Sequence, residues 1–255
     1  MPHLRYDLKG RVAIITGAGQ GMGAAVAEAL AANGATVVVN DIDIKKAKKV
    51  AQKIARENRQ AIAIQADVSN YQQVAQMVDT VLEKYGIIDI LVNNAGILRR
   101  RRFIEEINDD EWDLVMNVNV KGFFNCSKAV IGIMKKQKSG KIVNMSSSAG
   151  RSTSELGGAH YTASKAAVLG LTRHLAREVA SLNINVNAVC PGLIDTAMVK
   201  SSVSQKELEA QIKAIPMGRL GTPEEVADLV LFLVTDASSY INGATIDIGG
   251  ASLLI

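Results

Sequence analysis

Short, almost continuously apolar runs recur along this chain, and each is rich in β-branched residues. They cover residues 11–16, 35–40, 61–65, 88–94, 141–146, 184–190 and 244–248. Apolar runs of this length without polar alternation are typical of parallel strands that are covered on both faces. The pattern therefore predicts a sheet that is buried on both sides.

Helical patterns separate these predicted strands. They span residues 22–33, 43–58, 70–85, 110–136 and 160–182, and a further helix begins at Thr222-Pro223. Asn70 and Thr222 are of the residue types that cap helix N-termini. The regular alternation of strand and helix predicts an α/β fold of the Rossmann type, with a doubly wound parallel sheet and helices on both faces.

The segment 193–221 is the longest one without a predicted strand. It is polar and carries a short helical pattern near 204–213. Because long connections in compact domains often cover a site, we expect this segment to form a mobile lid. The chain has 255 residues, is 48% apolar and shows neither repeats nor a linker. We therefore expect a single domain over residues 1–255.

Charge and cysteine content exclude several classes of function. The formal net charge is +4 and the basic residues are scattered apart from one cluster, so we expect no nucleic-acid partner. Cys126 and Cys190 lie far apart, and no C-x-x-C or H-E-x-x-H pattern occurs, so we expect no metal site. The first eleven residues lack an apolar core, and no apolar run is long enough to cross a bilayer. These features favour a soluble, cytoplasmic protein without a membrane partner.

A glycine-rich loop, TGAGQGMG, follows the first predicted strand and opens the first predicted helix. In this context the pattern Gly19-x-Gly21-x-x-Ala24 indicates dinucleotide binding. The glycines let the backbone approach a pyrophosphate, and the helix N-terminus supplies N–H donors and a positive dipole. The candidate cofactor-binding residues of this loop are Gly17, Gly19, Gln20, Gly21, Met22 and Gly23.

Asp41 ends the second predicted strand, twenty residues after Gly21. Its carboxylate can accept hydrogen bonds from a ribose 2′-hydroxyl and would repel a 2′-phosphate. Gln20 lies inside the loop and Ile42 follows Asp41, so we see no arginine or lysine placed to bind that phosphate. The sequence therefore predicts NAD as the cofactor.

Two further strand ends carry candidate cofactor contacts. Asp67 and Val68 follow the third predicted strand and can flank an adenine, although an aspartate there equally suits the start of the next helix. Asn94 and Gly96 belong to NNAG at the end of the fourth predicted strand. Small residues and amides suit a chain that passes close to the cofactor, and they also suit a plain turn.

Tyr161 and Lys165 lie one helical turn apart, so their side chains project in the same direction. A free tyrosine has a pKa of about 10 and is a poor base at neutral pH. A lysine ammonium nearby favours the phenolate, and we expect it to lower the pKa of Tyr161. The pair would then exchange a proton near neutrality, while a serine hydroxyl beside it holds the substrate oxygen.

Taken together, these motifs resemble those of the short-chain dehydrogenase/reductase family. The matching segments are TGAGQGMG at 16–23, NNAG at 93–96, VNV at 118–120, NMSS at 144–147, YTASK at 161–165 and PGLIDT at 191–196. They run in the family's order and cover almost the whole chain. The resemblance implies a seven-stranded sheet, a nicotinamide cofactor and a homotetramer.

The resemblance also implies roles for individual residues. Tyr161 would act as the base in alcohol oxidation and as the acid in reduction, and Lys165 would bind the nicotinamide ribose. Asn119 would hold a water of a proton relay, although it also suits a buried helix position. Ile194 and Thr196 would contact the nicotinamide carboxamide, although they also suit a loop and a helix cap.

Two serines compete for the role beside the tyrosine. The family's usual spacing of thirteen residues before Tyr161 gives Ser148, and its usual Ser-Ser-x-x-Gly pattern, read back from Gly150, gives Ser147. We favour Ser147 because a strand end fixes the register of its residues, whereas the loop 150–160 can absorb an extra residue. Ser148 is then a candidate substrate contact.

The sequence thus predicts an NAD-dependent oxidoreductase that transfers hydride between a secondary alcohol and the corresponding ketone. One alternative is a 3-oxoacyl-[acyl-carrier-protein] reductase, which the chain also resembles. Three lysines favour it, Lys135, Lys136 and Lys138, whereas Gln20, Asp41 and Leu182 do not. Another alternative is a non-catalytic NAD-sensing scaffold, which the complete set of active-site motifs disfavours.

The basic cluster Arg99–Arg102 follows the fourth predicted strand, at the sheet edge where ligands bind. One interpretation is a solvated loop with acidic neighbours, for which Glu105, Glu106, Asp109 and Asp110 are close in sequence. The other is that some of these arginines, with Lys200 and Lys206 of the lid segment, bind an anionic tail of the substrate.

Overall fold

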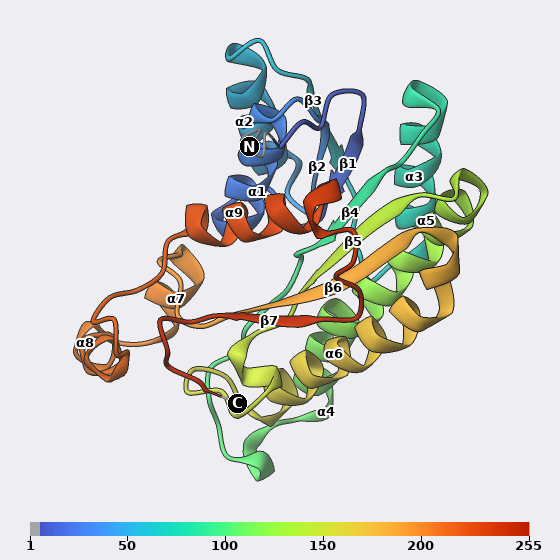
Figure 1. Cartoon of the computed structure of the whole chain (residues 1–255). Helices are drawn as coiled ribbons and strands as arrows, with labels where there is room; N and C mark the ends of the chain where they lie inside the picture. The colour runs from blue at the N-terminus through green and yellow to red at the C-terminus, as the bar shows by residue number, and fades with distance from the viewer. Residues whose placement is uncertain (1–5, 255) are drawn as a thin grey trace.

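Seven parallel strands form one sheet in the computed structural model, which describes residues 6–254. The strand order is β3-β2-β1-β4-β5-β6-β7. The strands are β1 Val12–Ile15, β2 Thr36–Asp41, β3 Ala61–Gln65, β4 Ile90–Asn93, β5 Gly140–Met145, β6 Ile184–Pro191 and β7 Thr245–Ile248 (Figure 1). Each strand closely matches one of the apolar runs, so the predicted Rossmann-type sheet is confirmed.

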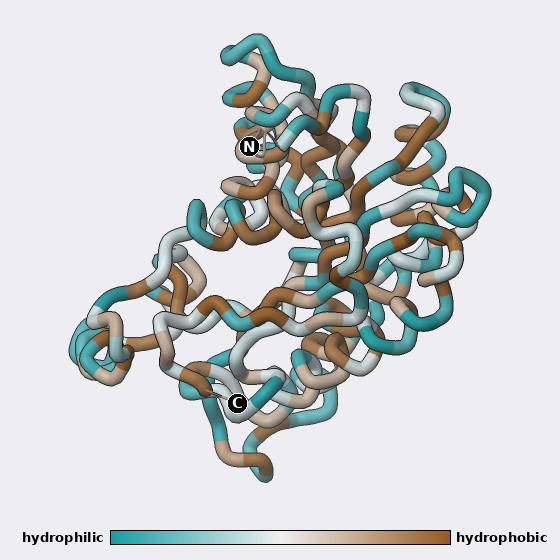
Figure 2. Tube along the Cα trace, in the orientation of Figure 1, coloured by the Kyte–Doolittle hydropathy of each residue, from teal (hydrophilic) through white to brown (hydrophobic). Residues whose placement is uncertain are grey.

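Helices cover both faces of this sheet. They are α1 Gly21–Ala32, α2 Ile44–Arg56, α3 Tyr71–Tyr85, α4 Asp109–Met116, α5 Gly122–Gln137, α6 Ala159–Val179, α7 Ala197–Ser202, α8 Gln205–Ala214 and α9 Pro223–Leu233. Ala13 and Ile15 of β1 share a core with α1, α2 and α9, whereas Val12 and Ile14 share one with α3, α5 and α6. Alternate strand residues thus face two apolar layers, and the strands carry much of the hydrophobic colour in Figure 2.

Side-chain caps fix where two of these helices begin. Asn70 accepts hydrogen bonds from two backbone N–H groups in the first turn of α3. Thr222 and Glu225 form a reciprocal capping box at the start of α9, with Pro223 at its first position. Both caps lie at the residues that the sequence predicts.

The predicted helix over 110–136 is interrupted. A π-helical turn, Asn117–Lys121, separates α4 from α5, and the Gly122 N–H bonds the Asn117 carbonyl five residues back. The extra residue in this turn places Asn119 on the buried side, where its amide contacts the backbone of Ile97. A tertiary contact therefore overrides the regular helix that the local sequence favours.

The sheet changes its winding direction between β1 and β4. The chain runs outward from β1 to β3, returns to β4 beside β1, and then continues outward on the other side to β7. Ligands of doubly wound sheets bind at the carboxyl ends of the strands at such a point. The loops after β1 and β4, which carry the glycine motif and NNAG, meet there.

The segment 193–221 contains α7 and α8, which stand apart from the sheet at the left of Figure 1. Helix α8 matches the predicted pattern near 204–213, whereas α7 has no counterpart in the prediction. Ile194 and Gly221 form a β-bridge that joins the two ends of the segment. Helices α7 and α8 therefore extend from a point at which the two ends of the segment are joined.

No helix within residues 6–254 combines the length and apolarity that a bilayer crossing requires. Met1–Arg5, which belong to the stretch searched for a leader sequence, lie outside the described residues.

Candidate active site

The loop after β1 forms one wall of a cleft of about 370 Å³ at the carboxyl edge of the sheet. Gly17 has a φ of +61°, and a Cβ there would lie 2.7 Å from the Cα of Ala95. A Cβ on Gly19 would lie 2.7 Å from the Asp41 carboxylate. Side chains at these two positions would collide with the NNAG turn and with the Asp41 carboxylate, so glycine lets the loop pack closely against both.

The N-terminus of α1 points its free N–H groups toward this cleft. Gln20 is the N-cap residue but makes no side-chain cap, and the first turn of the helix carries no acidic residue. Gly21, Met22 and Gly23 line the cleft. Uncapped N–H groups and the positive end of the helix dipole suit a phosphate, so this site fits a dinucleotide.

Asp41 lies at the far end of the same cleft. One carboxylate oxygen accepts a hydrogen bond from the Gly19 N–H at 2.9 Å, and the other accepts one from the Asp43 N–H at 2.9 Å. Two backbone donors thus hold the carboxylate against the glycine loop. The position agrees with the predicted contact to a ribose hydroxyl.

Five further predicted cofactor residues line the same cleft, namely Asp67, Val68, Asn94, Gly96 and Thr196, whereas Ile194 lines the neighbouring cavity described below. Asp67 accepts hydrogen bonds from the N–H and hydroxyl of Ser69, and Val68 beside it is buried. The Asn94 amide donates to the carbonyl oxygens of Thr16 and Gly17 and so joins the loops after β1 and β4. Gly96 lies next on the cleft wall, and Thr196 closes the cleft from the lid segment.

Lys46 is a cleft residue that the sequence reasoning missed. It belongs to the first turn of α2, and its Cβ lies 2.7 Å from where a Cβ of Gly19 would be. The statement that no lysine is placed to bind a 2′-phosphate therefore needs correction, because Lys46 lines the cleft beside Asp41. Its sequence position could have indicated this, because Lys46 lies five residues after Asp41, in the first turn of the helix that follows.

Tyr161 and Lys165 both project from α6 beneath the end of β5. Lys165 is buried, its Nζ donates to the carbonyl oxygen of Met145 at 2.8 Å, and Nζ lies 5.8 Å from the centre of the Tyr161 ring. The predicted shared direction of the two side chains is therefore present. A Cβ on Gly96 would lie 3.5 Å from Lys165 Nζ, which places the NNAG turn directly against the lysine.

Asn119 uses its amide to hold neighbouring elements together. Its Oδ1 accepts from the Ile97 N–H at 2.8 Å, and its Nδ2 donates to the Ile97 carbonyl at 3.0 Å and to the Ser164 hydroxyl at 3.1 Å. These bonds join the loop after β4 to α6, close to Tyr161. The residue is placed to support the site geometry.

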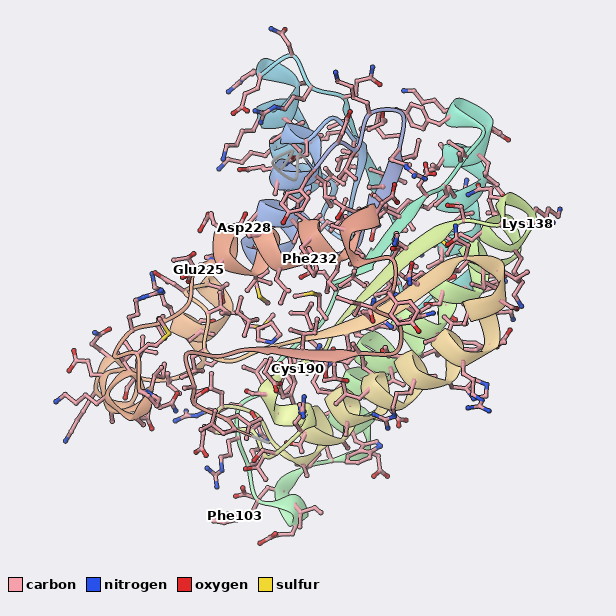
Figure 3. The ribbon with its side chains drawn as sticks, in the orientation of Figure 1. Phe103, Lys138, Cys190, Glu225, Asp228 and Phe232 are labelled. Atoms are coloured by element: carbon pink, nitrogen blue, oxygen red, sulfur yellow. The ribbon has the colours of Figure 1, made fainter. Side chains whose placement is uncertain are left out.

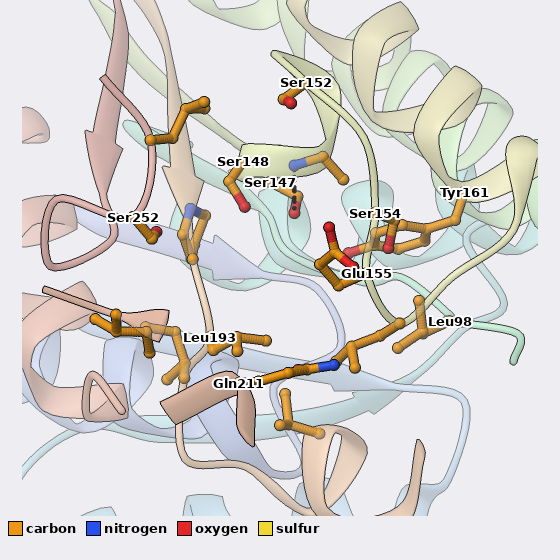
Figure 4. Close-up of a pocket in the computed structure, with 18 of the residues that line it drawn as sticks. Leu98, Ser147, Ser148, Ser152, Ser154, Glu155, Tyr161, Leu193, Gln211 and Ser252 are labelled. Carbon is orange, nitrogen blue, oxygen red and sulfur yellow. Dashed lines mark hydrogen bonds between the residues drawn. The ribbon is translucent and has the colours of Figure 1, made fainter. Parts of the chain in front are cut away.

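The structure separates the two candidate serines. Ser147 begins a short 3₁₀ turn and accepts from the Ala149 N–H at 3.1 Å, and its hydroxyl lies beside the hydroxyl of Tyr161 (Figure 4). Ser148 faces the cavity next to it. The preceding Ser146 is buried and donates to the Lys165 carbonyl at 2.8 Å.

Burial sets the protonation behaviour of this pair. It raises the pKa of Tyr161 above its usual value, and the hydrogen bond from Ser147 offsets this in part. Burial also lowers the pKa of Lys165 to about 8. The expectation that Lys165 lowers the pKa of Tyr161 is therefore wrong, because desolvation of the phenolate is the largest effect on this pKa and the lowering comes from Ser147.

A second cavity, of about 500 Å³, adjoins the cofactor cleft. Ser147, Ser148 and Tyr161 lie on one side of it, and Leu193 and Gln211 lie on the other (Figure 4), while the buried Ile194 also lines the cavity. Met22, Thr196 and Met198 line both spaces, so the two are continuous. A substrate in this cavity would lie against Tyr161 and face the cofactor cleft.

The arginine run lies outside this cavity and is compensated by carboxylates. Arg101 lies 3.5 Å from Glu155, and Arg102 lies 3.9 Å from Glu111. The acidic neighbours expected from the sequence, Glu105, Glu106, Asp109 and Asp110, make no ion pair with the run among the described residues. Its partners are instead Glu155, which is distant in the chain, and Glu111, which directly follows Asp110.

Glu111 also holds a histidine next to the active site. The buried His160 bonds Glu111 through Nε2 at 3.0 Å and accepts from the Tyr161 N–H at Nδ1, at 2.8 Å. This hydrogen bond lowers the pKa of Glu111. The start of α6 is thereby joined to α4. Nothing in the local sequence indicated this contact.

No group of three or more His, Cys, Asp and Glu side chains in the described part of the chain is arranged to hold a metal ion.

Known proteins share both the motifs and the fold. A family model described as enoyl-(acyl carrier protein) reductase matches residues 17–251. The 3-oxoacyl-[acyl-carrier-protein] reductase FabG of Thermotoga maritima is 41% identical over 247 residues, which cover 97% of this chain and 99% of that protein. The (2S)-[(R)-hydroxy(phenyl)methyl]succinyl-CoA dehydrogenase subunit BbsD of Thauera aromatica is 39% identical over 250 residues, which cover 96% of this chain and 98% of that protein.

The crystal structure of gox2181 has a TM-score of 0.94 and 37% sequence identity to this chain, and the match covers 97% of each. The glycine loop, the Ser147–Tyr161–Lys165 group and the sheet topology therefore occur together in a chain that matches these relatives along nearly its whole length. By sequence, fold and site geometry, this chain belongs to the short-chain dehydrogenase/reductase family, whose members are oxidoreductases that use a nicotinamide cofactor.

Proposed function

We propose that this protein transfers hydride between a secondary alcohol and NAD, or between NADH and the corresponding ketone. The observation that carries this proposal is the meeting of Ser147, Tyr161 and Lys165 where the cofactor cleft opens into the second cavity. A panel of secondary alcohols and ketones, followed by NADH absorbance, tests it. If the protein binds NAD but turns over no member of the panel, the result favours a non-catalytic NAD-sensing scaffold.

Each part of the cleft has a proposed role toward the cofactor. The loop Gly17–Gly23 and the N-terminus of α1 bind the pyrophosphate, and Asp41 accepts from the ribose hydroxyls. Asp67 and Val68 flank the adenine. Ile194 and Thr196 contact the nicotinamide carboxamide, as the family resemblance implies. When bound, NAD supplies the hydride acceptor for alcohol oxidation.

The protein's own residues handle the proton. Ser147 holds the substrate oxygen by a hydrogen bond, and Tyr161 takes the proton from the alcohol or returns it to the ketone. Lys165, anchored at the Met145 carbonyl, lies against Gly96 and within reach of a ribose in the cleft. Asn119 supports this geometry through its hydrogen bonds to the Ile97 backbone and to the Ser164 hydroxyl. It also holds the water of the proton relay.

Cofactor choice is expected to favour NAD over NADP by roughly tenfold to a hundredfold in kcat/KM. A 2′-phosphate facing Asp41 would meet a like charge held in place by two backbone N–H groups. Lys46 on the same wall limits the preference for NAD over NADP, because its exposed ammonium can reach a 2′-phosphate. Steady-state kinetics with both cofactors and one alcohol measure the ratio.

Two variants separate these contributions. Asp41→Ala is expected to lower the NAD:NADP ratio, whereas Lys46→Ala is the matched control and should raise it. Equal efficiency of the parent protein with both cofactors would contradict the assignment of NAD.

A second candidate function is reduction of a 3-oxoacyl-[acyl-carrier-protein], because a relative of that name is 41% identical. The lysines that favour it lie just before β5, at the amino end of that strand, whereas Ser147 follows its carboxyl end. Lys135 is already paired with Glu178 at 2.8 Å, and Lys138 lies at the right edge of Figure 3, away from Cys190 near the carboxyl end of β6. Assays with a 3-oxoacyl-[acyl-carrier-protein] beside the alcohol panel decide between the two.

We also propose that one domain spans the chain, that the segment 193–221 acts as its lid, and that four copies assemble. The family resemblance supports the tetramer. The exposed apolar side chains of Trp112, Leu114 and Phe124 on α4 and α5 are consistent with a partner subunit there.

A further inference from the structure

The wall of the substrate cavity is almost without charge. Among its described lining residues only Glu155 carries a carboxylate, and none is a lysine or arginine. Arg101 and Arg102 are engaged by Glu155 and Glu111, and Lys200 pairs with Asp195 at 2.6 Å. The cavity therefore offers no cation to an anionic tail, and its chemistry suits an uncharged substrate.

Polar groups are nevertheless distributed unevenly around this cavity. Ser147, Ser148 and Ser152 present hydroxyls from the loop after β5. Apolar side chains, among them Met198 and Leu193, also line the cavity, and Leu193 lies on the opposite wall (Figure 4). Gln211 is the amide on that wall, and Figure 4 draws it across the cavity from Ser147 and Ser148.

The side chain of Gln211 lacks a partner where it is buried. Its Oε1 is shielded from solvent and makes no hydrogen bond within the described residues. A buried amide oxygen without a donor destabilises the protein, so such groups are rare away from binding sites. Rotation of the amide by 180° would leave Nε2 unpaired in the same place. A hydroxyl satisfies either orientation, because it both donates and accepts.

We propose that Gln211 determines substrate specificity by binding a second hydroxyl group, so that the preferred substrate is an uncharged alcohol with at least two hydroxyls. This inference rests on the proposed alcohol oxidation at Tyr161. The reacting hydroxyl bonds Ser147 and Tyr161, the second one bonds Gln211, and the carbon skeleton lies on Leu193 and Met198. A substrate with a single hydroxyl leaves the amide unpaired and is disfavoured.

Matched pairs of alcohols test this role. We would measure kcat/KM with NAD for cyclohexanol against 1,4-cyclohexanediol, and for 2-pentanol against 1,4-pentanediol, because the second hydroxyl of each diol lies several bonds from the reacting one and can reach the opposite wall. The parent protein is expected to prefer the diol of a pair by about tenfold or more. Gln211→Leu should bring the ratio to about one, by raising KM for the diol while kcat changes little.

Two further variants control for general damage to α8. Gln211→Glu keeps an acceptor oxygen at the same length and should retain part of the diol preference. Gln205→Leu removes an exposed glutamine of the same helix, which bonds Glu209 outside the cavity, and should leave the ratio unchanged.

The outcomes distinguish this proposal from the proposed function. Turnover of the monoalcohols without preference for the diols, or a diol preference that survives Gln211→Leu, overturns the role of Gln211 alone. Absence of turnover with every alcohol and ketone overturns the alcohol oxidation itself, and the role of Gln211 with it.

Discussion

Tyr161→Phe is expected to lower kcat by about a thousandfold while NAD binding stays within a small factor of the parent. The substitution removes only the phenolic hydroxyl, which is the proton-transferring group beside Ser147, and positioned acids and bases contribute about 10²–10⁴-fold. The cofactor cleft keeps the glycine loop, Asp41 and the N-terminus of α1. Steady-state kinetics and titration of NADH fluorescence measure the two effects separately.

Two comparisons make this result specific. Tyr71→Phe changes a tyrosine on α3 that is 39% exposed, and it should leave both quantities unchanged. Lys165→Ala should weaken NAD binding as well as turnover, because its Nζ lies between Met145 and the NNAG turn. Substantial activity of the Phe variant would mean that another group carries the proton.

Ser147→Ala is expected to lower kcat by about a hundredfold or more, which is typical of losing one hydrogen-bond donor to a reacting oxygen. Ser148→Ala should have a smaller effect, mainly on KM, because Ser148 lines the cavity without lying beside the Tyr161 hydroxyl. Both variants are assayed with the best alcohol of the panel. The reverse ranking would show that the spacing counted from Tyr161 identifies the serine better than the Ser-Ser-x-x-Gly pattern does.

The fold could be predicted from the sequence because the strands consist of the residue types that suit their buried environment. The run INVNAVC matches β6 from Ile184 to Pro191, whose residues are all buried. Val, Ile and Ala suit a parallel strand between two layers of helices, and the turns between them carry clear signals such as Asn70 and Thr222. The glycine loop could be predicted equally well, because its proposed function depends on backbone conformation, which the glycine positions indicate.

Contacts between distant segments were not accessible in this way. Arg101 pairs with Glu155 rather than with the acids that follow the run, and no periodicity encodes that pairing. Lys46 reaches the cofactor cleft only because α2 packs beside the glycine loop. The direction of the Tyr161 pKa depends on how deeply the phenol is buried, which sequence spacing does not reveal.

The π turn at Asn117–Lys121 has a consequence for how this chain tolerates changes in length. Closing a hydrogen bond over five residues instead of four accommodates one more residue than an α-helical turn does. Removal of Val118 would let α4 and α5 join as a regular helix, so the layers around the sheet would survive. Asn119 would then rotate by about 100° around the helix axis and lose its hydrogen bonds to the Ile97 backbone. A homologue or designed variant shortened by one residue here should therefore remain folded, while the nucleotide cleft loses Val118 from its lining and the positions of Tyr161 and Lys165 lose their support.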